Sequence, residues 1–155
     1  MSLRPVLRPP PIDAEVLDRM IAVVARIGGA WQTGEPLDEL MREHDELTGR
    51  HDIPARHYRD LCSKREERDA AVQTLRGRAP IVPDITREEL VEIVRRIRDD
   101  PKALDMIWWL DLYMSNTAAG DDWNPLLWLD DQWIARIGTA EPTAEQIVDE
   151  TLRAT

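Results

Sequence analysis

Three copies of one helix-start pattern constrain the fold of this chain more than any other feature. In each copy a Ser or Thr is followed three residues later by Glu or Gln, just ahead of an apolar periodic run. The hydroxyl can accept a hydrogen bond from the third helical amide, while the Glu or Gln side chain accepts one from the amide of the Ser or Thr. The copies are Ser63–Glu66, Thr86–Glu89 and Thr143–Gln146. Each predicts the first turn of a helix.

Single residues mark further helix boundaries in the first half of the chain. Asp13 can cap a helix whose apolar residues recur every three or four positions, and Gly28 with Gly29 is expected to end it. Pro36 suits the first turn of a second helix, which Gly49 is expected to end. The first half is therefore predicted to be a series of helices.

The second half also carries helical signals. The helix after the second start pattern is expected to end at Asp99–Pro101, and another is predicted over Ala103–Asn116. Residues 123–129 contain Pro125 and can form only one or two turns, and residues 130–141 are predicted to be a loop. The alternation of apolar and polar residues that is typical of strands is absent. The sequence therefore predicts an all-α protein.

Two clusters of prolines predict the domain organisation. Residues 1–12 are expected to form an extended, proline-rich leader, because their prolines exclude a helix. Residues 79–83 are expected to form a linker for the same reason. Between them, residues 13–78 are predicted to be a smaller helical region of unknown role. Residues 84–155 are predicted to form a helical bundle.

The charge of the chain is negative and unevenly distributed. Of the net charge of −10, −9 falls on residues 81–155 and −1 on residues 1–80. This balance argues against a nucleic acid as direct partner, because phosphates would be repelled. No apolar run approaches the roughly 20 residues that span a bilayer, and the N-terminus lacks an apolar signal segment. With Cys62 as its single cysteine, the chain is expected to be cytoplasmic, without a disulfide or a membrane partner.

The candidate catalytic and metal-binding side chains match no established pattern. The spacings of His44, His51, His57 and Cys62 fit no common zinc site, and His44 lies on an otherwise apolar face. The histidines are therefore expected to be satisfied core or surface residues, and Cys62 a buried thiol. A Cys62 nucleophile with His57 as its base is disfavoured. The basic cluster over residues 56–68 alternates with acidic residues, which indicates a salt-bridged surface. We expect no enzyme activity and no cofactor.

Five of the six tryptophans lie in the second half of the chain. Trp108 and Trp109 are about 100° apart on a helix, so a narrow core stripe cannot easily bury both. We expect Trp109 and Trp123 to lie in the core, and Trp108 and Trp128 to face a basic protein partner among carboxylates. The alternative is that all these rings fill the core of a protein without Phe.

The segment from Val82 to Ala154 resembles the immunity proteins of the nuclease colicins and S-type pyocins. The likeness begins at Pro83–Ile97, which is similar to the family's capped first helix. It continues at Leu126–Leu129, in the place of the family's short third helix, and ends at Thr143–Val148, which is similar to the start of its final helix. The order and approximate spacing of these motifs carry the resemblance.

The resemblance implies a distorted four-helix bundle that inhibits a basic cytotoxic nuclease by covering a site beside its catalytic centre. The family's second helix sets specificity and its third helix supplies anchor residues. The chain departs from the family at Pro125, where the family has a binding Asp, and at Leu129, which lacks a tyrosine hydroxyl. The partner-binding residues implied by position, together with the two nearby carboxylates, are Leu104, Asp105, Trp108, Asp111, Ser115, Asp121, Asp122, Trp128 and Leu129.

These observations together predict an immunity-type protein that neutralises a cognate bacteriocin-like toxin domain by stoichiometric binding. The predicted partner is a basic toxin domain of nuclease type, and the chain itself is predicted to be a monomer or a weak dimer. Two alternatives stay open. One is a general helical interaction or regulatory module without a toxin target, and the other is a metal- or carboxylate-dependent enzyme.

Overall fold

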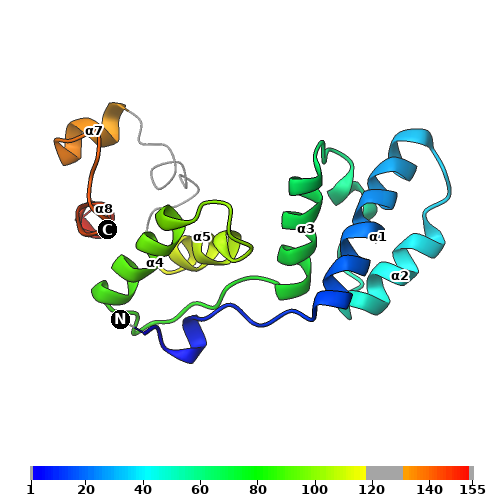
Figure 1. Ribbon diagram of the computed structural model, residues 1–155, viewed down its shortest axis with the longest axis horizontal. Coiled ribbons are helices and arrows are strands. Elements are labelled where there is room, and N and C mark those ends of the chain that lie inside the picture. The colour runs from blue at the N-terminus through cyan, green and yellow to red at the C-terminus, as the bar shows by residue number, and fades with distance from the viewer. Residues whose placement is uncertain (1, 118–130, 154–155) are drawn as a thin grey trace. The chain divides into compact units, whose positions relative to one another are not determined.

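The computed structural model describes residues 2–117 and 131–153 (Figure 1). These residues form helices and no strand, so the all-α prediction is confirmed for this part of the chain. The chain divides into two compact units. Unit 1 consists of Met1–Pro9 and Arg78–Thr155, and unit 2 is Pro10–Gly77. Within the described ranges, no helix is both long and apolar enough to cross a membrane.

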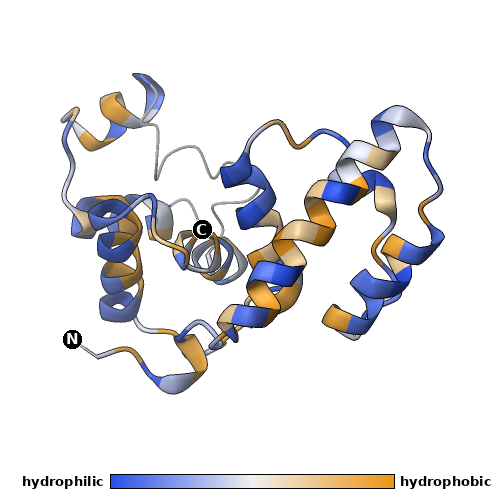
Figure 2. Cartoon of the chain, turned by 45° about the vertical axis from the view of Figure 1, so that its right-hand side comes forward, coloured by the Kyte–Doolittle hydropathy of each residue, from blue (hydrophilic) through white to orange (hydrophobic). Residues whose placement is uncertain are grey.

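Unit 2 is built around its first helix. The helices are α1 (Ala14–Thr33), α2 (Asp38–Thr48), the short 3-10 helix η2 (Ala55–Tyr58) and α3 (Lys64–Arg76). The longer helices carry a hydrophobic and a hydrophilic side (Figure 2), and α1 packs against α2, η2 and α3. Their hydrophobic sides meet in one core, whose buried residues are Met20, Val23, Val24, Ile27, Ala30, Leu40, Tyr58 and Ala71.

Local capping chemistry sets most helix ends of unit 2, as predicted. The Asp13 carboxylate accepts hydrogen bonds from the first amides of α1 at 3.0 and 3.1 Å. Ser63 and Glu66 form the reciprocal capping box of α3. Gly49 ends α2 with a φ of 65°, a left-handed conformation that glycine adopts without strain.

The predicted end of α1 at Gly28 and Gly29 is wrong. The helix continues through both glycines to Thr33 and ends at Gly34. A Cβ atom at Gly28 would lie 3.0 Å from the carbonyl oxygen of Tyr58, whereas nothing lies within 4 Å of one at Gly29. Gly28 therefore allows η2 to approach the α1 backbone closely, which a local sequence pattern does not reveal.

Alanine substitutions at the two glycines should change the stability of unit 2 in opposite directions. Gly29→Ala is expected to raise the free energy of unfolding by about 0.5–1 kcal/mol, because alanine has the higher helix propensity. Gly28→Ala is expected to lower it by about 1–3 kcal/mol, because the new methyl group overpacks against the η2 backbone. Hydrogen exchange of the α1 amides measures both. Equal effects at the two positions would show that η2 does not pack closely on α1.

Unit 1 is built around its central helix α4 (Arg87–Asp99). Helix α4 packs against α5 (Met106–Ser115) and α8 (Ala144–Arg153), and α7 (Asp131–Ile137) packs against α8. The predicted capping boxes at Thr86 and Thr143 are both present. The buried residues contributed by α4 and α5 are Leu90, Val91, Ile93, Val94, Ile97, Met106, Trp108, Trp109, Leu110, Leu112 and Tyr113.

The loop predicted for residues 130–141 is wrong over Asp131–Ile137, which form a helix. Helix α7 lies within residues 130–141, which were expected to be a loop, because Trp133, Ile134 and Ile137 share one side of a short helix that Gly138 ends. The short helix expected at residues 123–129 lies outside the described residues. The four-helix bundle therefore stays a prediction, within an all-α fold that is confirmed.

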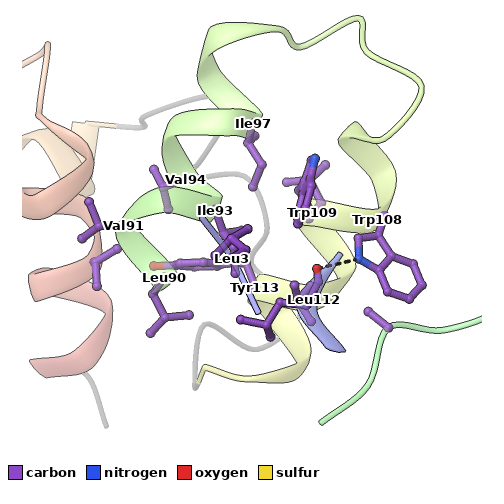
Figure 3. Packing of buried hydrophobic residues seen from close by; sticks show 14 of the residues in the cluster. Leu3, Leu90, Val91, Ile93, Val94, Ile97, Trp108, Trp109, Leu112 and Tyr113 are labelled. Atoms are coloured by element: carbon purple, nitrogen blue, oxygen red, sulfur yellow. Dashed lines mark hydrogen bonds between the residues drawn. The ribbon is translucent and has the colours of Figure 1, made fainter. Parts of the chain in front are cut away.

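The N-terminal segment differs from the extended leader predicted for residues 1–12. Pro5–Leu7 form one 3-10 turn, η1, and Leu3 and Leu7 are 1% and 0% exposed in the core of unit 1. Figure 3 shows Leu3 among residues of α4 and α5. Proline excludes an interior helical position but suits the first position of such a turn. The unit boundary therefore falls at Pro9, and residues 1–9 belong with the second half of the chain.

Candidate partner-binding surface

Helix α5 and the turn before it carry the described part of the predicted partner surface. Leu104 and Asp105 lie in that turn and Ser115 at the end of the helix, and all three are half-buried. Trp108 and Asp111 lie between them, one turn apart on one side of α5. The remaining predicted contact residues, Asp121, Asp122, Trp128 and Leu129, lie outside the described residues, as does Trp123.

Trp108 lies in the core, which differs from its predicted position on an open surface. Its side chain is only 6% exposed, and its ring nitrogen Nε1 donates a hydrogen bond to the carbonyl oxygen of Leu7 at 3.2 Å (Figure 3). The neighbouring Trp109 is also buried, with the Arg96 guanidinium 5.1 Å from its ring centre, as expected for a core residue. Both consecutive tryptophans are buried because the N-terminal segment covers the side of α5 that a narrow core stripe would leave open.

Asp111 binds the chain's own backbone. Its Oδ2 accepts a hydrogen bond from the Ala79 amide at 2.5 Å. Asn116, at the end of the same helix, accepts from the Val82 amide at 2.5 Å and donates to the Pro80 carbonyl at 2.8 Å. Residues 79–82 are thus held along α5, with Ala79 and Val82 buried, and are not the linker that the prolines predicted.

Two apolar side chains are exposed on the segments that cover α5. Val6 precedes Leu7 and is 50% exposed, and Ile81 lies between two anchored residues and is 75% exposed. Three hydrogen bonds with the side chains of Asp111 and Asn116 hold the backbone around Ile81. Neither Val6 nor Ile81 is among the contact residues predicted from the sequence. Both are exposed apolar residues next to a residue whose backbone is hydrogen-bonded to α5 or its C-cap, and this feature is visible only in the structure.

Arg4 ties the N-terminal segment to α4. Its guanidinium donates to both carboxylate oxygens of Glu89, at 2.6 and 2.9 Å, and to Asp84 at 2.8 Å. Hydrogen bonds from Arg4 lower the pKa values of Glu89 and Asp84 below their ordinary range. Both carboxyls are therefore ionised at neutral pH, and Asp84 adds an exposed negative group three residues after Ile81.

The acidic character is shared more evenly between the units than between the sequence halves. Unit 1 holds sixteen Asp and Glu against ten Lys and Arg, a net charge of −6. Unit 2 has a net charge of −4. The difference from the sequence halves arises because Arg4, Arg8 and Arg78 belong to unit 1. Unit 1 is still the more acidic of the two.

Unit 2 contains a separate polar constellation, a chain of hydrogen bonds that runs from its surface into its core. The exposed His51 contacts Asp45 Oδ2 through Nδ1 at 2.9 Å, and the buried His44 contacts Asp45 Oδ1 through its own Nδ1 at 2.9 Å. His44 Nε2 lies 2.8 Å from the Tyr58 hydroxyl, which lies 3.0 Å from the Thr74 hydroxyl. One carboxylate thus joins two imidazoles, and one imidazole joins it to a buried tyrosine.

The chemistry of these groups fixes the direction of the hydrogen bonds for a neutral His44. A carboxylate only accepts, so Nδ1 of His44 donates to Asp45 and Nε2 accepts from Tyr58. The Tyr58 hydroxyl then accepts from Thr74, so the side-chain polar atoms of His44 and Tyr58 all have partners within this series of hydrogen bonds. Burial raises the pKa of Tyr58, which keeps its hydroxyl protonated at neutral pH. His44 is a satisfied histidine of the core, which is one of the two placements expected for the histidines.

The remaining candidate groups are Cys62, His57 and the basic cluster over residues 56–68. Cys62 is exposed, so the prediction of a buried thiol is wrong. His57 packs its ring edge against Tyr58 with 5.2 Å between the ring centres. Among residues 2–117 and 131–153, no three His, Cys, Asp or Glu side chains are grouped to hold a metal ion. Arg59, Arg65 and Arg68 pair with neighbouring aspartates, as the predicted salt-bridged surface requires.

Acid should weaken unit 2 through Asp45. Hydrogen bonds from His44 and, second, from His51 lower the pKa of the Asp45 carboxyl in the folded state. A carboxyl whose folded pKa is lowered stabilises the fold above its unfolded pKa of about 3.9, and this contribution is lost as the pH falls through the lower folded value. Asp45→Asn should therefore flatten the decline in stability below about pH 4.

Hydrogen exchange of the α1 and α3 amides at a series of pH values measures this decline separately for unit 2. Asp38→Asn is the matched control, because Asp38 lies on the same helix and is exposed. If the stability of unit 2 falls as steeply with decreasing pH in Asp45→Asn as in the wild type, then the histidines do not hold this carboxyl ionised.

Comparison with known proteins adds no relative: no protein-family model matches the chain, and neither a curated protein nor a solved structure is significantly similar to it. The resemblance to the nuclease immunity proteins therefore stays a prediction that rests on its motifs.

Proposed function

We propose that the chain is a non-enzymatic, cytoplasmic immunity-type protein that neutralises a basic toxin domain of nuclease type by stoichiometric binding. The contact surface is the side of unit 1 where residues 3–8 and 79–82 cover α5, together with the half-buried Leu104, Asp105 and Ser115. The motif order of the second half and the net charge of −6 on unit 1 support this proposal.

The exposure of Ile81 on an anchored backbone is the observation that carries the proposal. An apolar side chain that is 75% exposed on a segment held by three hydrogen bonds needs little further ordering when a partner covers it. Asp84 lies two residues after this segment and Asp105 lies in the turn before α5, and both add negative charge to unit 1. Carboxylates at the rim speed the encounter with a basic partner, and a buried apolar anchor slows its dissociation.

Trp108 and Asp111 take an indirect role in this proposal. Trp108 holds the backbone of Leu7, and so positions Val6, while Asp111 holds Ala79, and so positions Ile81. Trp128 and Leu129 keep their proposed role as anchors, with Asp121 and Asp122 as nearby carboxylates, on the resemblance alone.

Substitution of Ile81 should weaken partner binding without changing the fold. Ile81→Ser is expected to raise the Kd for the toxin domain encoded beside the chain at least about tenfold, because a buried apolar anchor contributes about 2 kcal/mol or more. Calorimetric titration measures the Kd and the stoichiometry, which is expected to be one to one. Leu152→Ser on α8 is the matched control, since Leu152 is also an exposed apolar residue.

Cell growth gives the functional counterpart of this titration. Co-expression of the wild-type chain should restore growth to cells that produce the toxin domain, and Ile81→Ser should restore it less well. A wild-type chain that neither binds nor protects would exclude the proposed function. If the wild-type chain binds and protects, and the Ile81→Ser variant does so equally well, the contact must lie elsewhere on unit 1.

A further inference from the structure

The N-terminal segment packs on the rest of unit 1 through contacts with residues far from it in the sequence. Leu3 and Leu7 are buried in the core of unit 1, where Figure 3 shows Leu3 among residues of α4 and α5, and Arg4 pairs with Glu89 and Asp84. The Leu7 carbonyl accepts from Trp108, one hundred and one residues later in the chain. All these contacts are non-covalent and are made by residues 3–7.

The residues that connect this segment to α1 favour an extended backbone. Pro9, Pro10 and Pro11 separate it from α1, and consecutive prolines adopt an extended conformation of about 3.1 Å per residue. The boundary between the units falls inside this run. On its far side, the Pro10 carbonyl accepts a hydrogen bond from Arg76 at 3.1 Å, within unit 2. The chain therefore leaves unit 1 through a stiff spacer that has no helical or hydrogen-bonded turn to unfold.

We propose that the N-terminal segment is exchangeable, so that unit 1 of one copy binds residues 3–8 of a second copy and the two copies complete each other reciprocally. Every contact that the segment makes within one chain is preserved in the exchange. The two arrangements then differ only in the entropy of association and in the freedom of the proline spacer. The partner is thus a second copy of this chain, which contributes Leu3, Arg4 and Leu7 to the core of the first.

The ion pair between Arg4 and Glu89 allows a direct test in the full-length chain. Arg4→Glu and Glu89→Arg each place like charges together within one chain. In a reciprocal dimer of these two variants, one unit 1 regains the original pair and the other gains the reversed pair. An equimolar mixture unfolded in urea and refolded should therefore give a mixed dimer at least about tenfold in excess over either homodimer, as counted by native mass spectrometry.

The double variant Arg4→Glu with Glu89→Arg is the matched control. It restores the pair within each chain, and it should refold as a monomer at the concentration where the mixture dimerises. A mixture that stays monomeric while the double variant folds would overturn the proposal, because the pair would then form only within one chain. Arg4→Glu refolded alone should give no more dimer than the wild-type chain at the same concentration, because exchange within this variant brings the same like charges together. As much dimer from Arg4→Glu alone as from the mixture would overturn the proposal too, because that contact would not depend on the ion pair of the segment.

The wild-type chain decides the question if the charge-reversed chains fail to fold. Isotopically light and heavy wild-type chains, unfolded and refolded together at increasing concentration, should give dimers of intermediate mass. The absence of such dimers at every concentration would overturn the proposal.

Discussion

Leu7→Ala is expected to lower the free energy of unfolding of unit 1 by about 2–5 kcal/mol, although the residue lies at the far end of the sequence from α4 and α5. Leu7 is 0% exposed, and its truncation leaves a cavity beneath Trp108, whose ring nitrogen binds the Leu7 carbonyl. Hydrogen exchange measured by mass spectrometry should show loss of protection over residues 78–116. The amides of residues 14–76 should keep theirs, because unit 2 has its own core.

The neighbouring Val6 is the matched control for this substitution. Val6 is half-exposed, so Val6→Ala should change the same free energy by no more than about 0.5 kcal/mol. Equal protection of residues 78–116 in the wild type and in Leu7→Ala would mean that the N-terminal segment is not part of the core of unit 1.

Trp108→Ala is expected to lower the stability of unit 1 by about 3–5 kcal/mol, because it removes a large buried ring together with its hydrogen bond. Trp108→Phe keeps an aromatic ring in the core but removes the bond to Leu7. It should cost less, with about 1 kcal/mol for the bond itself. Urea unfolding followed by circular dichroism, with hydrogen exchange to assign the loss to unit 1, measures both variants.

This expectation replaces the one that the sequence alone suggests. A partner-facing Trp108 would leave stability unchanged when replaced by alanine and would weaken only partner binding. A Trp108→Ala chain with wild-type stability and a raised Kd would therefore restore the original prediction. Loss of protection throughout α5 would instead place the ring in the core, as the structure does.

Helix positions were predictable because their signals are local. The hydroxyl and carboxyl groups of a capping box lie three residues apart, so Thr86 with Glu89 marks the start of α4 without any knowledge of the fold. Gly28 shows the limit of such reasoning. Because Gly28 lacks a side chain, the backbone of Tyr58, thirty residues later, can approach α1 closely. A local sequence pattern does not contain this contact and predicts a helix end at Gly28.

The partner surface was harder to predict because it depends on contacts between distant residues. The sequence correctly predicted a helix within Ala103–Asn116, but not which segment covers the side of α5 that a narrow core stripe would leave open. The covering residues are Leu7 and Ala79, from the two proline-rich stretches that were expected to be a leader and a linker. A proline excludes helix without excluding burial, so composition alone could not place these segments in a core.

The covering segments also change which residues can meet a partner. Trp108 and Asp111 hold backbone from inside unit 1, and Val6 and Ile81 are the apolar side chains that remain exposed above them. The acidic groups retain their proposed role in steering. The proposed surface is thus a composite of three stretches of the chain that are far apart in sequence.

The most direct test of this organisation is the excision of unit 2. One chain would carry a flexible Gly/Ser linker in place of residues 10–77, and a second would consist of residues 78–155 alone. If residues 1–9 complete unit 1, the first chain should unfold cooperatively in urea and exceed the second in free energy of unfolding by at least about 3 kcal/mol, the contribution of two buried leucines. Equal free energies of unfolding for the two chains would contradict the claim that residues 1–9 complete unit 1.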